Sequence, residues 1–266
     1  MDLAYDRTGS GEPLVLLHGL GHHRRAWSAV VPMLAAERDV ITVDLPGHGD
    51  SPAVPPSTAG DFGALADEVE KFLRSIGLEA PHVAGNSLGG LIALELGARG
   101  YAASVTALSP ASFWNVPERI WIVALFRTAS LLGARLPQGV LDRIVHTRLP
   151  RAALFGLFFG RPGRHDPAVL VDDLRGLGRQ RAAIGEVLKR IKETPVPAAP
   201  PAGIPVTIGW GRRDLVLFPN QARRARRAIP TARIVALRRC GHVPMGDDPA
   251  HVASVLLDGS RRPRPG

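Results

Sequence analysis

The stretch Gly85-Asn86-Ser87-Leu88-Gly89-Gly90 decides the fold, because it joins two segments of opposite character. Before it, His82-Val83-Ala84 is short and apolar, as in a strand that is buried on both faces of a sheet. After it, residues 88–99 have the apolar spacing of a helix. A tight turn from strand to helix exposes a serine hydroxyl in a cleft, and glycines at 85 and 89 let neighbouring backbone pass close to it. The stretch therefore predicts a nucleophilic serine at position 87.

The residues on either side of this turn alternate between strand and helix patterns. Strand-like apolar runs lie at 14–17, 40–43, 82–84 and 105–108, and helical spacing lies at 26–37, 61–76 and 88–99. Alternation of this kind is typical of a mostly parallel sheet with helices on both faces. We therefore expect an α/β fold.

The alternation stops at Pro110. From about Ala111 to Thr194 the pattern is helical or loop-like, and Pro195-Val196-Pro197-Ala198-Ala199-Pro200-Pro201 then predicts a stiff connector. Strand patterns return at 205–210 and 232–237, with helical patterns at 219–228 and 249–257. We expect a core of residues 1–110 and 204–259, a helical cap with its connector at 111–203, and a disordered basic tail at 260–266.

Two loops of the second half contain the partners that a serine nucleophile needs. A serine hydroxyl attacks a carbonyl only when a base takes its proton and an acid orients that base. Asp214 follows the predicted strand 205–210, and His242 follows the predicted strand 232–237. Open α/β sheets build their sites where the carboxyl ends of parallel strands meet. Ser87, Asp214 and His242 are therefore the predicted catalytic residues.

Composition excludes several other classes of protein. The chain has 266 residues and is 45% hydrophobic, which is enough for a sizeable core. One cysteine, Cys240, cannot form an internal disulfide, and no Cys/His cluster has zinc-ligand spacing. The net charge of +9 comes from scattered bases, most of them arginine, without a nucleic-acid-binding motif. No signal peptide or membrane-spanning run is visible, so a cytoplasmic protein without nucleic-acid partner or membrane insertion is expected.

Taken together, the motifs resemble those of the α/β-hydrolases that carry a helical cap. The matching marks are His18-Gly19, the run Asp44-Leu45-Pro46-Gly47-His48-Gly49-Asp50-Ser51, the Ser87 turn, the Asp214 loop and Gly241-His242-Val243-Pro244-Met245. In that family two backbone N–H groups form an oxyanion hole, and the resemblance places them at Leu20 and Leu88. Family order also favours Asp214 over Asp44 as the acid, because Asp214 follows the serine in the chain. The other position that the family uses for its acid holds Ser109-Pro110, without a carboxylate.

Some residues near these motifs have plainer interpretations. His48 resembles the structural turn of the family, and Cys240 has no local base, so we expect a packed thiol. His22 and His23 lie in the loop after Gly19 and are candidates for contact with substrate. In the predicted cap, aromatic residues such as Phe126, Phe155, Phe158 and Phe159 either line a pocket or hold helices together. Phe113, Trp114 and Val243 are the predicted pocket residues.

Three functions fit this sequence. The first is a serine hydrolase, similar to esterases, that cleaves a carboxylic ester or related acyl bond of a small, largely apolar substrate without a metal or organic cofactor. The second is a carbon–carbon bond hydrolase, which Gly85-Asn86-Ser87 resembles, although His22-His23-Arg24-Arg25 departs from the loop of that group. The third is a non-catalytic binding protein of the same fold. The oligomeric state and the natural substrate do not follow from the sequence.

Overall fold

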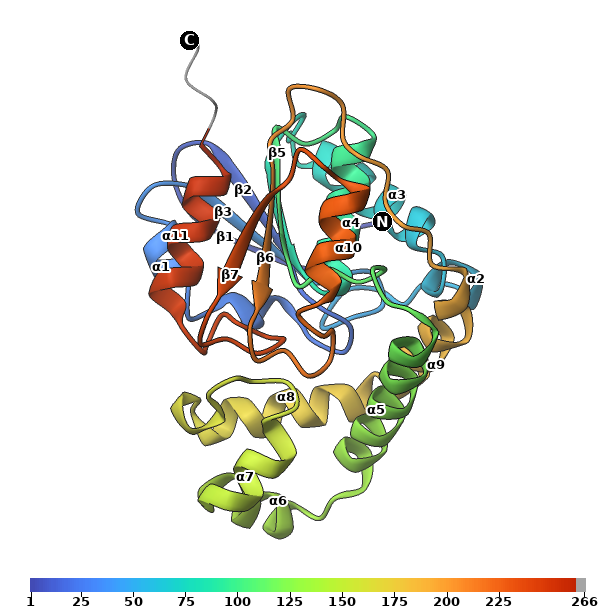
Figure 1. Ribbon diagram of the computed structural model, residues 1–266, viewed down its shortest axis with the longest axis vertical. Coiled ribbons are helices and arrows are strands. Elements are labelled where there is room, and N and C mark those ends of the chain that lie inside the picture. The colour runs from blue at the N-terminus through green and yellow to red at the C-terminus, as the bar shows by residue number, and fades with distance from the viewer. Residues whose placement is uncertain (262–266) are drawn as a thin grey trace.

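A seven-stranded sheet forms the centre of the computed structural model, which describes residues 1–261 (Figure 1). The strand order across the sheet is β1-β3-β2-β4-β5-β6-β7, and every neighbouring pair is parallel except β1 and β3. The strands are β1 (Tyr5–Gly9), β2 (Pro13–Leu17), β3 (Asp39–Val43), β4 (His82–Asn86), β5 (Ser104–Leu108), β6 (Val206–Gly211) and β7 (Arg233–Leu237). The prediction of a mostly parallel α/β fold is confirmed.

Helices cover both faces of this sheet, as the apolar runs of its inner strands require. On one face α11 packs against β5, β6 and β7 and also contacts α1; on the other, α4 packs against β2, β4 and β5 and is covered by α3 (Figure 1). The helical elements outside the β5–β6 connection are η1 (Arg24–Trp27), α1 (Val31–Leu34), α2 (Pro56–Ala59), α3 (Phe62–Ser75), α4 (Leu88–Ala98), α10 (Gln221–Ala228) and α11 (Pro249–Gly259).

Between β5 and β6 the chain forms a further group of helices, which we call the inserted helices. They are α5 (Val116–Arg135), α6 (Gln138–His146), α7 (Arg148–Phe155), η2 (Pro162–Arg164), α8 (Pro167–Arg179), α9 (Arg181–Arg190) and η3 (Ile191–Glu193). Helix α5 begins with a capping box between Asn115 and Glu118 and packs along α8. Figure 1 shows the group at the end of the sheet to which the β6 and β7 arrows point, which is the edge where the predicted site residues lie.

The predicted disordered tail begins too early. Ser260 is buried, and the guanidinium of Arg38 donates hydrogen bonds to its hydroxyl at 3.2 Å and to its carbonyl oxygen at 3.1 Å. These hydrogen bonds hold Ser260, at the end of α11, against Arg38, which precedes β3. The remainder of the predicted tail, from residue 262, lies outside the described residues.

No helix within residues 1–261 is by itself long and apolar enough to cross a membrane. Helices α5 and α6, bent by 116° at their junction, meet the criteria of length and composition only when they are taken together.

Candidate active site

Ser87 lies on a turn between β4 and α4 whose backbone is strained. Its φ of 55° and ψ of −113° fall outside the regions that non-glycine residues normally adopt. A side chain at either flanking glycine would collide with backbone: a Cβ at Gly85 would lie 2.1 Å from the Gly89 carbonyl oxygen, and one at Gly89 would lie 2.2 Å from that of Leu17. The turn is therefore possible only with these glycines, and it presents Ser87 at the amino end of α4.

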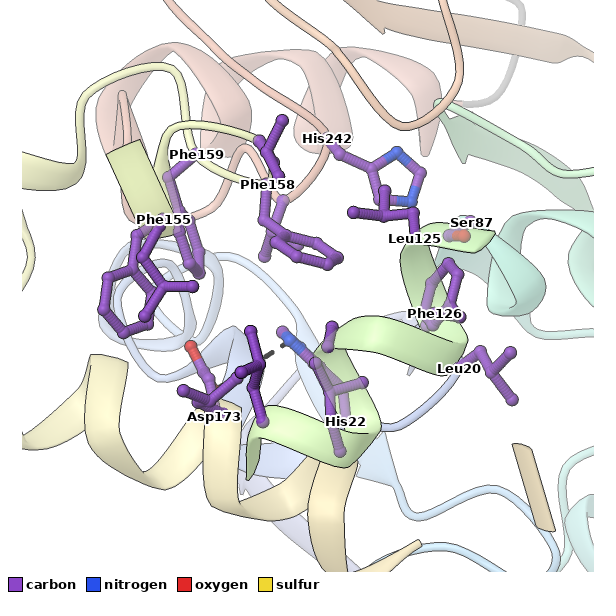
Figure 2. A pocket seen from close by; sticks show the side chains of 18 of the residues that line it. Leu20, His22, Ser87, Leu125, Phe126, Phe155, Phe158, Phe159, Asp173 and His242 are labelled. Carbon is purple, nitrogen blue, oxygen red and sulfur yellow. Dashed lines mark ion pairs between the residues drawn. The ribbon is translucent and has the colours of Figure 1, made fainter. Parts of the chain in front are cut away.

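Asp214 and His242 meet in a buried contact. Nδ1 of His242 lies 2.9 Å from Oδ2 of Asp214, and Oδ1 of Asp214 accepts hydrogen bonds from the backbone N–H groups of Val216 (2.9 Å) and Leu217 (2.8 Å). With its proton on Nδ1, donated to the carboxylate, the imidazole presents Nε2 as a lone-pair acceptor. That Nε2 is buried and has no hydrogen-bond partner among the described residues, and both His242 and Ser87 line one cavity (Figure 2).

The loop that carries His242 is fixed from two sides. The Asn86 side-chain amide donates to the carbonyl oxygens of Leu108 (3.1 Å) and His242 (2.9 Å), which ties the loop to the end of β4. From the inserted helices, the Phe158 carbonyl accepts hydrogen bonds from His242 N–H at 2.7 Å and Val243 N–H at 3.1 Å. Because the contacts hold the backbone on both sides of the imidazole, the ring is held in place before any substrate binds.

A buried carboxylate joins the same loop to the inserted helices. Asp247 is fully buried and accepts hydrogen bonds from the backbone N–H groups of Gly160 (2.7 Å), Arg161 (2.8 Å) and Gly241 (2.8 Å). His165 Nε2 lies 3.2 Å from its Oδ1. Sequence reasoning missed Asp247, although a carboxylate five residues after His242 was the available signal.

The loop after β2 runs beside Ser87 and is held by a neutral histidine. Leu45 N–H donates to Nε2 of His18 at 2.9 Å, so the proton of this ring is on Nδ1, which lies 2.8 Å from the Gly19 carbonyl oxygen. Burial lowers the pKa of His18 well below its ordinary value, which keeps the ring neutral. A Cβ at Gly19 would lie 3.2 Å from that of Ser87, so the loop passes directly beside the serine.

The predicted oxyanion-hole residues adjoin the serine. Leu20 follows Gly19 in this loop, Leu88 begins α4, and both line a small apolar cavity together with Ser87. Among residues 1–261 neither backbone N–H donates a hydrogen bond to a protein acceptor. Two free N–H groups beside a serine hydroxyl are suited to stabilise negative charge on a substrate oxygen.

The larger cavity at Ser87 is mostly apolar. With space open to solvent included, about 720 Å³ is free of protein atoms here, against about 410 Å³ in the smaller cavity. Its walls come mainly from α5, α7 and α8 and from the loop after α7, with Phe126, Phe155, Phe158 and Phe159 among the lining residues (Figure 2). The part of the chain that the structure describes contains no cluster of three or more His, Cys, Asp or Glu residues placed to hold a metal ion.

Comparison with known proteins agrees with this architecture. The profile described as "Alpha/beta hydrolase family" matches residues 14–255. The chain belongs to the alpha/beta hydrolase family. A Mycobacterium tuberculosis protein, described as uncharacterized, is 30% identical over 95% of this chain and 76% of its own length. A monoacylglycerol lipase of Xenopus laevis is 23% identical, over 96% of this chain and 77% of its own length.

Solved structures give the same result. A bacterial membrane phospholipase A is 26% identical to this hydrolase, with a TM-score of 0.75 over 98% of this chain and 84% of the other. Lipases and esterases thus occur among the relatives of this alpha/beta hydrolase and the proteins that share its fold.

Of the predicted pocket residues of this hydrolase, Val243 lines the larger cavity, and Trp114 lines the smaller one. The prediction for Phe113 is wrong, because Phe113 lines neither cavity. Its ring is buried edge-on against Trp210, with 6.5 Å between ring centroids, and its carbonyl accepts from Arg224. The chain direction after β5 turns this side chain into the core before the inserted helices begin.

Two rivals for catalytic roles have structural ones in this hydrolase. Asp44 is fully buried and accepts hydrogen bonds from the backbone N–H groups of Arg24 (2.5 Å) and Asp50 (2.9 Å) and from the Arg24 guanidinium. It therefore holds two loops together and does not contact His242. Burial raises the pKa of the Cys240 thiol to about 12, so it is protonated at neutral pH, which confirms the interpretation of a packed thiol.

Sequence reasoning left His22 open and missed Asp173 altogether. Both side chains line the larger cavity, His22 from the loop after β2 and Asp173 from α8. The helical or loop-like pattern from about Ala111 to Thr194 gave no sign of which α8 residues face the site, because that depends on how α8 packs against α5.

Proposed function

We propose that this alpha/beta hydrolase is a serine hydrolase that cleaves a carboxylic ester, or a related acyl bond, of a small and largely apolar substrate. The observation that carries the proposal is the buried contact of His242 with Asp214, which leaves Nε2 of His242 free in the cavity that contains Ser87. The hydroxyl, the base and the acid thus stand in the order that nucleophilic catalysis requires.

The first half of the reaction forms an acyl-enzyme. The Ser87 hydroxyl oxygen attacks the substrate carbonyl carbon, and its proton passes to Nε2 of His242. The N–H groups of Leu20 and Leu88 bind the oxyanion, and each such donor is worth about 3–4 kcal/mol of barrier lowering. The bond to the leaving alcohol then breaks as His242 returns the proton to that oxygen.

The second half releases the acid. Water attacks the acyl carbonyl while Nε2 of His242 takes one of its protons, and the proton then returns to the Ser87 oxygen as the acyl bond breaks. Asp214 stays ionised throughout, orients the ring and stabilises the transient imidazolium. The inserted helices act as a cap whose apolar side chains hold the substrate chain and exclude water.

Hydrolysis of p-nitrophenyl esters tests the proposal. Wild type should release p-nitrophenol, and Ser87→Ala should lose turnover while it keeps its circular dichroism spectrum and melting temperature. Ser130→Ala is the matched control, because Ser130 is also buried but its hydroxyl donates to the Arg127 carbonyl within α5, away from the cavity. A folded Ser87→Ala variant with wild-type turnover would refute the mechanism.

A further inference from the structure

The larger cavity contains two titratable side chains that the proposed mechanism does not use. Apart from Asn86, Ser87 and His242 at the reacting end, its lining side chains are apolar except for Thr128, His22 and Asp173. Figure 2 shows His22 and Asp173 directed toward one another, with Asp173 on the side of the cavity away from Ser87. The pair therefore lies where the far part of a substrate chain would be, beyond the reach of Ser87.

Neither side chain has its hydrogen bonds satisfied. Nε2 of His22 is 3.9 Å from Oδ1 of Asp173, which is too long for a hydrogen bond. Nδ1 of His22 is buried and has no partner, and the Asp173 carboxyl makes no side-chain hydrogen bond within residues 1–261. Only 9% and 13% of the two side chains are exposed. Because buried polar groups are almost always hydrogen-bonded, this pair has the capacity for a ligand group.

The neighbours of the pair keep it in place. The Gln180 side chain donates to the His22 carbonyl oxygen at 3.2 Å, which fixes the loop against the start of α9. The adjacent residues make the corresponding contact outside the cavity, where Nε2 of His23 lies 3.0 Å from Oδ2 of Asp172. The hydrogen bond between His23 and Asp172 thus holds the loop and α8 together, while the neighbouring His22–Asp173 pair faces the cavity without a hydrogen bond between its members.

Burial makes this a neutral pair between about pH 4 and about pH 7. Burial lowers the pKa of His22 to about 4, with a smaller contribution from His242, and burial raises the pKa of Asp173 to about 7. Between these values the imidazole is neutral and the carboxyl is protonated, so together they offer hydrogen-bond donors and acceptors without net charge. A hydroxyl group, which both donates and accepts, matches this set.

We infer that His22 and Asp173 form a polar subsite that selects esters whose chain in the larger cavity carries a hydroxyl group. The inference rests on the proposed ester hydrolysis and adds the substrate class. The apolar walls hold the methylene chain, and the hydroxyl hydrogen-bonds to the pair at the far end. A plain alkyl chain of equal length would leave both polar groups without a partner, which disfavours it.

Two matched pairs of esters test the subsite and show which side of the ester occupies it. The acyl pair is p-nitrophenyl ω-hydroxyoctanoate and p-nitrophenyl nonanoate, which differ by a hydroxyl in place of a methyl group. The alcohol pair is the butyrate monoester of octanediol and nonyl butyrate. Wild type should favour the hydroxyl member of one pair by about tenfold in kcat/KM, as one net hydrogen bond provides.

Variants separate a subsite from a general effect on the enzyme. Asp173→Leu should abolish the preference for the hydroxyl ester while it retains hydrolysis of the alkyl ester, and Asp173→Asn, which keeps a donor and an acceptor, should preserve the preference. Asp142→Leu is the matched control, because Asp142 is exposed on α6 and does not line the larger cavity, and it should behave as wild type.

The outcomes distinguish the two proposals. Hydrolysis that depends on Ser87 but shows no hydroxyl preference in either pair would overturn the subsite and leave the proposed function standing. A preference that survives in Asp173→Leu would also overturn it. Absence of Ser87-dependent hydrolysis of all four esters would overturn both.

Discussion

The carboxyl of Asp173 should make folding stability depend on pH in a way that Asp173→Asn removes. Burial raises its pKa from an ordinary 3.8 to about 7, so the folded state binds this proton more tightly than the unfolded state. The contribution of the Asp173 carboxyl to folding stability is therefore greatest below pH 3.8. That stability is lost as the pH rises toward 7, because above 3.8 the unfolded chain releases the proton and the folded chain does not.

The size of the effect follows from the two pKa values. Each unit of difference corresponds to about 1.4 kcal/mol. Titration from 3.8 to about 7 gives a cost of about 2 kcal/mol at pH 5 and about 4 kcal/mol at pH 8. An asparagine at 173 is neutral at both pH values. The free energy of unfolding of Asp173→Asn minus that of wild type should thus grow by about 2–3 kcal/mol from pH 5 to pH 8.

Urea denaturation of both proteins at pH 5 and pH 8, followed by tryptophan fluorescence, measures this difference. The titrations of histidines that do not interact with Asp173 cancel in the subtraction. Asp172→Asn serves as control, since its neighbours lower the pKa of Asp172 overall despite partial burial, and its carboxylate is ionised in both states above pH 5. A difference for Asp173→Asn that stays constant within about 0.5 kcal/mol, the usual additivity error, would refute this account of the buried carboxyl.

Three further predictions concern the site and its turn. Asp214→Asn should lower kcat for p-nitrophenyl esters by about 10⁴-fold at neutral pH, because the amide favours the wrong tautomer of His242. The melting temperature should change little. A drop in kcat of less than tenfold would contradict the assigned role. Gly85→Ala should destabilise the fold by about 3 kcal/mol, because the new Cβ would collide with the Gly89 carbonyl oxygen. Gly139→Ala is the control and should not destabilise the fold, since the space around its Cβ is open. Equal unfolding midpoints for the two variants would contradict the turn geometry. Acyl esters of medium length should outperform acetyl esters in kcat/KM, since the larger cavity is lined mostly by apolar side chains that a longer chain would contact. A series that peaks at acetyl would contradict this.

Much of the core followed from the sequence because its signals are local. The predicted strands at 82–84 and 105–108 lie within β4 and β5, and the helical pattern at 61–76 corresponds to α3, Phe62–Ser75. Buried parallel strands are apolar throughout, and Asp61 caps α3 by accepting from Ala64 N–H. The residues of such elements indicate where the elements begin and end, so their prediction does not require knowledge of how the strands pair in the sheet.

Other elements depend on contacts that a local pattern does not contain. Strand β1 escaped prediction because all five of its residues are exposed, and it forms by antiparallel pairing with β3 and the Arg7–Asp39 ion pair. The helical pattern at 26–37 forms only η1 and α1, and within the segment predicted as helical or loop-like the chain changes at Gln180 from α8 to α9. Helices α8 and α9 pack against one another and against α5.

In the candidate site, too, local sequence predicts some residues and not others. Ser87, Asp214 and His242 could be predicted because each follows a strand whose end reaches one edge of the sheet. Asp173 could not, because it reaches the cavity from a helix whose orientation is set by packing against α5. For the same reason the sequence identified the aromatic residues of the inserted helices as a group, but it did not show that the Phe113 side chain packs against Trp210 in the core.

Labelling with a fluorophosphonate probe, read by intact mass, tests the central claim most directly. An activated serine reacts with the probe only when its base and its oxyanion-stabilising N–H groups are in place. Wild type should gain the mass of one adduct, Ser130→Ala should do the same, and Ser87→Ala should gain none. Folded wild type that stays unlabelled, or a Ser87→Ala variant that is labelled as fully as wild type, would contradict the assignment of Ser87 as the nucleophile.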